Sequence, residues 1–199
     1  MAIYSKFNSI WSTENGNAFV GKIFVGDEMK YPKDVFYSAD TNSVLDILKK
    51  INGFWGAVTT NGNKAGWIAS DRIRSYPVFY AQKGEDLFIS SDAYWVREQC
   101  SIIEINKDAE EEFLMTGYVT GNETLFVGLK QIQQGEVVFF EWSDNIGKYT
   151  FSSYQYYRYL HKDSDEASEQ ILMQKLDDAM LASFNRLIKF ADSRTIIIP

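Results

Sequence analysis

Cysteine, histidine and proline are scarce in this chain, and their scarcity excludes several kinds of site. The 199 residues include one cysteine, Cys100, one histidine, His161, and three prolines. A single cysteine cannot form an internal disulfide, and one cysteine with one histidine cannot complete a zinc cluster. We therefore expect no metal site in this chain, and His161 has no partner for a catalytic triad.

Long apolar runs and an excess of basic residues are also missing. No run of about 18 apolar residues occurs, and the first residues lack the apolar stretch of a signal peptide. The 20 Lys and Arg residues are outnumbered by 27 Asp and Glu residues, which gives a formal net charge of -7. Because binding to nucleic acid needs a basic surface that releases counterions, we expect no nucleic-acid partner. We also expect no membrane partner and a cytoplasmic protein.

Apolar and aromatic residues are plentiful, at 45% and 16% of the chain. This amount provides one substantial core and little material for a second independent one. Continuous apolar runs such as FWGAV, at residues 54–58, indicate strands whose two faces are both covered. The composition therefore favours a layered α+β domain.

Turn residues divide the middle of the chain into β-hairpins. Gly62 follows Asn61, and the pair tolerates the positive φ of a tight turn, while Gly84 lies in a second polar turn. The strand-forming segments that flank these turns are residues 54–60, 66–70, 78–81 and 87–90. We predict that these four successive strands form one antiparallel sheet. Three further strands are predicted at residues 17–25, 136–142 and 149–157, the last two as another hairpin or as a sheet edge.

Three helices are predicted from caps and periodic apolar residues. Asn106 precedes a run of acidic residues, and apolar residues then lead to Gly117, as is typical of a short capped helix. Asp40 precedes apolar residues at helical spacing over 44–51, and a helix-capping role for Asp40 is favoured. Residues 163–192 carry apolar side chains at helical spacing and predict a long amphipathic helix.

The final segment, residues 193–199, predicts an apolar strand of the buried parallel type that stops as soon as it forms. A lone strand leaves its backbone hydrogen bonds unsatisfied. We therefore expect the chain to continue into a following domain.

Three segments in order resemble the class II glutamine amidotransferase domain of asparagine synthetases: INGFWGAVT at 51–59, ASDRIRSYPVFYA at 69–81 and DLFISSD at 86–92. In the second segment the family has Ala-Arg-Asp-Arg-x-Gly-x-x-Pro-Leu-Tyr-Tyr, and the positional matches are Asp71, Arg72, Pro77 and Tyr80. Residues 113–140 look like a fourth family element. The last residues are similar to the first strand of the family's synthetase domain.

The resemblance implies a four-layer αββα sandwich of antiparallel sheets, the fold of N-terminal nucleophile hydrolases. It implies that residues 1–157 form a glutaminase-like domain. Residues 158–199 are then a linker, a long helix and the first strand of an incomplete ATP-pyrophosphatase domain. ATP and Mg²⁺ are expected only in that synthetase domain, so this chain itself is expected to hold no cofactor. The expected partner is the chain's own synthetase domain, and a homodimer is left open.

The resemblance also implies that the glutaminase chemistry is lost. Family members that hydrolyse glutamine expose a cysteine as the first residue after methionine removal. Ala2 occupies this position here, so we expect no catalytic residue and no glutaminase activity. Asp40, Asp71 and Arg72 are candidates for a residual pocket, although anchoring of a turn is the favoured role for the last two.

Two functions are compatible with these features of the sequence. The first is a scaffold that supports an ATP-dependent, amide-forming synthetase domain. The alternative is a self-contained module that reuses the fold to bind a protein or a small molecule.

Overall fold

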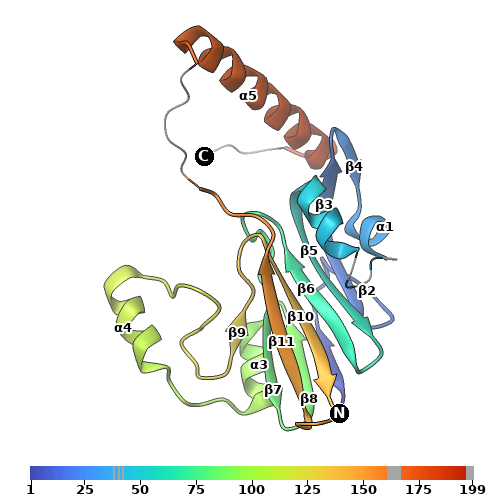
Figure 1. Cartoon of the computed structure of the whole chain (residues 1–199), viewed down its shortest axis with the longest axis vertical. Helices are drawn as coiled ribbons and strands as arrows, with labels where there is room; N and C mark the ends of the chain where they lie inside the picture. Colours follow the sequence, from blue (N-terminus) through green and yellow to red (C-terminus); the bar gives the residue numbers. More distant parts are fainter. Residues whose placement is uncertain (38, 40, 42, 161–166, 196–199) are drawn as a thin grey trace.

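A computed structural model describes residues 1–37, 39, 41, 43–160 and 167–195. Asp40, His161 and residues 196–199 of the strand predicted at 193–199 lie outside the described residues. The described chain is a mixed α+β fold with two β-sheets and a C-terminal helix (Figure 1). The elements in chain order are β1 (Ile3–Lys6), β2 (Ser12–Glu14), β3 (Asn17–Val25), β4 (Glu28–Lys30), α1 (Pro32–Phe36), α2 (Val44–Lys50), β5 (Ile51–Asn61), β6 (Ala65–Ser70), β7 (Phe79–Lys83), β8 (Asp86–Ser90), α3 (Ala93–Cys100), α4 (Lys107–Thr116), β9 (Lys130–Gln131), β10 (Glu136–Ser143), β11 (Lys148–Gln155) and α5 (Glu169–Ala191).

The larger sheet has seven strands in the order β11-β10-β6-β5-β3-β2, and β4 also pairs with β3. All of its pairings are antiparallel. It contains the predicted hairpins β5–β6 and β10–β11 and the predicted strand at residues 17–25. Gly62 has φ +58 in the β5–β6 turn, which is the conformation that the sequence predicted for this position.

The smaller sheet has the order β1-β8-β7-β9. Its β7–β8 pairing is the second predicted hairpin, with Gly84 at φ +59 in the turn. β1 pairs with β8 in parallel, with Ile3 opposite Leu87, so this sheet is mixed and not purely antiparallel.

The prediction that strands β5 to β8 share one sheet is wrong, because β5 and β6 belong to the larger sheet whereas β7 and β8 belong to the smaller one. Val58 and Ile68 of the first hairpin lie in the same buried cluster as Leu87 and Ile89 of the second. The two hairpins therefore contribute side chains to one core instead of pairing strand to strand.

Three apolar clusters hold the helices and sheets together. The first cluster contains side chains from both sheets, among them Val58 and Leu87. The second joins the larger sheet to α1 and α2 through Trp55, Phe36 and Leu48. The third joins the smaller sheet to α3, with residues such as Phe88, Val96 and Cys100. Neighbouring residues of β5 therefore enter different clusters, and both faces of this strand are packed, as the run at residues 54–58 predicted.

The predicted short helix after Asn106 is confirmed as α4. The Asn106 side chain accepts a hydrogen bond from the Ala109 amide at 3.3 Å, and the helix ends at Gly117 with φ +81. The helix predicted over residues 44–51 is α2, but its N-cap residue is Ser43 and not Asp40.

The long helix predicted within residues 163–192 is confirmed as α5, which begins at Glu169. Its last turn rests on the larger sheet. Buried Lys22 of β3 donates to the Phe190 carbonyl at 3.0 Å, and the Phe190 and Phe54 rings lie edge to face with centroids 5.2 Å apart. From this end, the helix extends away from the sheets (Figure 1).

Candidate functional site

The turn after β6 is built around the buried carboxylate of Asp71, which is 1% exposed. Its two oxygens accept hydrogen bonds from the amides of Trp55 at 2.9 Å, Ile73 at 2.8 Å and Ser75 at 3.2 Å. The Asp71 carbonyl also accepts from the Gly135 amide at 2.8 Å. Asp71 thus links β5 and the segment before β10 to the turn that connects the larger sheet to the smaller one. Its carboxylate is engaged by the backbone and is not directed towards a ligand.

Arg72 ties β5 to the residues that follow β11. Its Nη2 donates to the Ile51 carbonyl at 3.1 Å, and its guanidinium lies 4.5 Å from the centroid of the Tyr157 ring. The neighbouring Tyr156 hydroxyl donates to the Ser70 carbonyl at 2.6 Å, and burial raises the pKa of Tyr156 far above its usual value. Tyr156 and Tyr157 therefore contact the Asp71–Arg72 turn and stabilise it.

A pocket of about 530 Å³ lies between α5 and the larger sheet. Arg72 lines it together with Asn52 and Phe54 of β5, and Met180 and Phe184 come from α5. The Nε of Arg72 is buried without a hydrogen-bond partner. Of the three predicted residual-pocket residues, Arg72 lines this pocket, Asp71 is engaged with backbone amides, and Asp40 lies outside the described residues. Of the two described residues, only Arg72 lines the pocket.

Ala2, the residue at the expected nucleophile position, lies beside the β7–β8 hairpin. Its carbonyl accepts a hydrogen bond from the Leu87 amide at 2.9 Å. The Met1 ammonium group lies 3.3 Å from the Glu85 carboxylate in the turn of this hairpin. In Figure 1 this end of the chain and α5 lie at opposite ends of the molecule.

Cys100 carries the only thiol of the chain and is buried at the end of α3. It packs in the third apolar cluster with Ala81, Val96 and Leu129. Burial raises the pKa of the thiol to about 11, and the nearby Lys83 lowers it by less. The residue is a packing residue and a poor nucleophile, because the thiolate is the reactive form.

We expect this burial to show directly in alkylation kinetics. At pH 8 a thiol with a pKa near 11 is about 0.1% thiolate, whereas an ordinary cysteine is about 10–25% thiolate. Iodoacetamide should therefore modify native Cys100 at least about 100-fold more slowly than the urea-unfolded chain, as followed by mass spectrometry. Equal rates in the two states would contradict the buried, protonated thiol.

Metal ligands and membrane-spanning helices are two further features that bear on function. Within the described residues, no group of three or more His, Cys, Asp or Glu side chains is arranged to hold a metal ion. The described helices also include none with the length and apolar character needed to span a membrane.

Comparison with known proteins places this architecture in a family. Residues 35–156, more than half of the chain, match the glutamine amidotransferase domain. The chain belongs to the glutamine amidotransferase domain family. The match runs from α1 to the end of β11 and includes Asp71, Arg72 and Cys100, whereas α5 lies outside it. No curated protein matches the amidotransferase-like chain.

The predictions from sequence missed Arg74, which lies two residues after Arg72 and has φ +58. The pattern that residues 69–81 resemble, Ala-Arg-Asp-Arg-x-Gly, has a glycine at this position. This replacement could have identified Arg74, because an arginine at a position that favours glycine suggests that its side chain has a role.

Proposed function

We propose that residues 1–157 are a catalytically silent glutaminase-like domain of an asparagine synthetase-like, ATP-dependent amide-forming ligase, and that they act as a scaffold for its synthetase domain. The observation that carries the proposal is the environment of Cys100. The only thiol of the chain is buried against apolar side chains, and its pKa is raised to about 11. Glutamine hydrolysis by the family's chemistry needs an exposed, activated thiolate, and Ala2 supplies none.

The proposed architecture is the four-layer αββα sandwich of N-terminal nucleophile hydrolases. Its support is the set of three apolar clusters, since one contains residues of both sheets and the others join each sheet to helices. The parallel pairing of β1 with β8 places the start of the chain within the smaller sheet.

The proposed scaffold role assigns residues 158–199 to a linker, a long helix and the first strand of an incomplete synthetase domain. Apolar side chains on α5 support it, because they are exposed in this structure: Ile171, Leu172, Met173, Leu176, Met180, Leu181, Phe184 and Ile188. Burying such a set against a following domain would be favourable. The following domain would be the one that binds ATP and Mg²⁺.

We expect no release of ammonia from L-glutamine by the purified protein. The assay is coupled glutamate dehydrogenase detection of ammonia, run across the fractions of a size-exclusion peak. Cys100→Ala, purified in parallel, is the matched control, because it removes the only thiol. Ammonia release that follows the wild-type protein peak and disappears in the Cys100→Ala variant would refute catalytic silence.

The alternative, a self-contained binding module, is favoured by a separate observation. A second and larger pocket lies away from α5, on the smaller sheet.

A further inference from the structure

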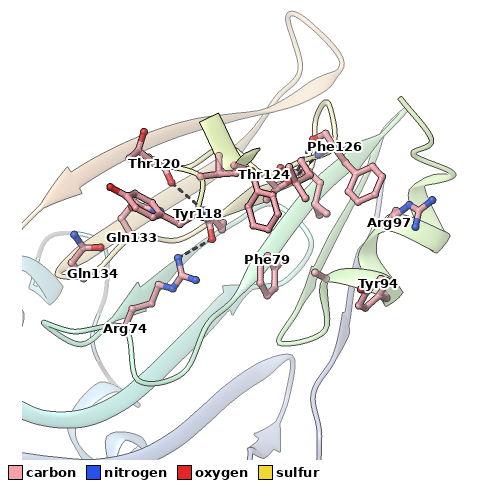
Figure 2. Close-up of a pocket in the computed structure, with 17 residues that line it drawn as sticks. Arg74, Phe79, Tyr94, Arg97, Tyr118, Thr120, Thr124, Phe126, Gln133 and Gln134 are labelled. Atoms are coloured by element: carbon pink, nitrogen blue, oxygen red, sulfur yellow. Dashed lines mark hydrogen bonds between the residues drawn. The ribbon is translucent and has the colours of Figure 1, made fainter. Parts of the chain in front are cut away.

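The second pocket has a volume of about 730 Å³ and opens between the smaller sheet and the segment that follows α4 (Figure 2). Its walls come from the turn after β6, from β7 and β9, from α3, and from residues 118–126. In Figure 2, Arg74 lies at one end of the pocket, Arg97 lies at the other, and Phe79 lies between them. The pocket is therefore formed by segments that are far apart in sequence.

The charged residues that line this pocket are Arg74 and Arg97, and no described lining residue is an Asp or Glu. This lining is positive although the whole chain has a formal net charge of -7. A concave site lined by cations concentrates the field and favours an anionic ligand.

Arg74 adopts a backbone conformation that is unfavourable for an arginine. Its φ of +58 is in the left-handed region, where a residue other than glycine is strained. Strain of this kind is retained where the surrounding structure or the function needs the side chain. Here the side chain extends from the turn towards the pocket (Figure 2).

One nitrogen of the Arg74 guanidinium is held by hydrogen bonds within the protein. Its Nη1 donates to Gln131 Oε1 at 2.8 Å and is 3.4 Å from the Ile132 carbonyl. Gln131 is itself held, because its Nε2 donates to the carbonyls of Glu123 at 2.9 Å and Gly121 at 3.2 Å. The guanidinium is thus pre-oriented, and it still has donors on its remaining nitrogens.

A second unused donor lies in the same wall. The Nε2 of Gln133 is buried and has no hydrogen-bond partner. A buried amide nitrogen without a partner is destabilising, and an acceptor bound in the pocket would relieve this. Gln133 and Arg74 both line the pocket, so one bound acceptor group has two candidate donors.

The rest of the pocket is apolar and aromatic. Phe79 and Leu129 come from the sheet side, and Phe126 is stacked under the Arg97 guanidinium at 4.2 Å from its ring centroid. Flat apolar walls of this kind suit a planar ring system.

We propose that this pocket binds a small aromatic carboxylate. The carboxylate pairs with the Arg74 guanidinium, and the ring lies against Phe79, Leu129 and Phe126. Arginine and carboxylate form two parallel N–H···O bonds, which a neutral amide cannot reproduce. The site is independent of the proposed scaffold role, because no residue of α5 lines it.

The test compares 2-naphthoate with 2-naphthamide, its neutral counterpart of the same shape, by isothermal titration calorimetry on the full chain. We expect the acid to bind at least about tenfold more tightly than the amide, since a charged pair adds about 1.5 kcal/mol or more. Arg74→Gly should abolish this preference while the amide binds as before. Arg158→Gly, which removes an exposed arginine outside the pocket lining, should keep it.

Arg74→Gly suits the positive φ at this position and is expected to fold, as circular dichroism will check. Arg74→Asn is the second variant, because asparagine also tolerates this conformation. Equal affinity for the acid and the amide would overturn the proposal. So would a preference for the acid that persists in the folded Arg74 variants, or no binding of 2-naphthoate up to its solubility limit.

Discussion

Gly21→Ala is expected to prevent folding or to lower the free energy of unfolding by more than about 4 kcal/mol. Gly21 lies in β3 opposite Trp55 and has φ +85. A Cβ at this position would lie 1.9 Å from the Phe54 carbonyl oxygen, which is a backbone atom of the central strand β5. The clash cannot be relieved by a side-chain rotation, so β3 and β5 would have to separate. Thermal and urea unfolding followed by circular dichroism measure the loss.

Gly62→Ala is the matched control for this substitution. Gly62 also has a positive φ, +58, but nothing lies within 4 Å of the position of its Cβ. Only the local backbone strain remains, and we expect a loss of about 1 kcal/mol. If the two substitutions lowered the free energy of unfolding by similar amounts, the close approach of β3 to β5 would not account for the effect of Gly21→Ala.

Asp71→Asn is expected to lower the free energy of unfolding by about 3 kcal/mol, which corresponds to a fall in Tm of about 10 °C for a chain of this size. The Asp71 carboxylate accepts hydrogen bonds from three backbone amides in a site that is 1% exposed. Asparagine replaces one acceptor oxygen with a donor, so an NH₂ group would face backbone N–H groups. Differential scanning calorimetry is the measurement.

Asp177→Asn on the exposed face of α5 makes the same chemical change without burial, and it should alter stability by less than about 0.5 kcal/mol. If Asp71→Asn were as mild as this control, the role of Asp71 as the anchor of the turn would have to be given up.

The elements that the sequence predicted well are those specified by local chemistry. Gly62 and Gly84 mark hairpin turns because positive φ is needed there, and both hairpins are present. Asn106 and Gly117 mark the two ends of α4 for similar reasons. In each case a few neighbouring residues determine the conformation, whatever lies across the core.

The assignment of strands to sheets was not predictable in the same way. The hairpins β5–β6 and β7–β8 carry similar apolar patterns, and these patterns do not say whether two hairpins pair by their edges or stack by their faces. The parallel pairing of β1 with β8 joins residues 84 positions apart, such as Ile3 and Leu87, and no local signal marks it. The connection from the larger sheet to the smaller one is stabilised by Asp71, which accepts a hydrogen bond from the Trp55 amide on another strand.

The candidate site was predictable only in part. Asp71 and Arg72 were identified from the family pattern, and their engagement with backbone groups agrees with the anchoring role favoured from the sequence. The pocket around Arg74 was not identified, since its walls come from segments between residues 74 and 134 that only the fold brings together. The domain boundary after residue 157 remains a prediction.

The hydrogen bonds that attach α5 to the rest of the protein lie near its C-terminal end. The helix is held near its end by Lys22 on the Phe190 carbonyl and by Lys189 on the Asp27 carbonyl. With 23 residues, it is about 34 Å long. A rotation of about 10° at the attached end would carry the opposite end through about 6 Å. A small change in the position of the β3–β4 turn would therefore displace the first turns of α5 by several ångströms.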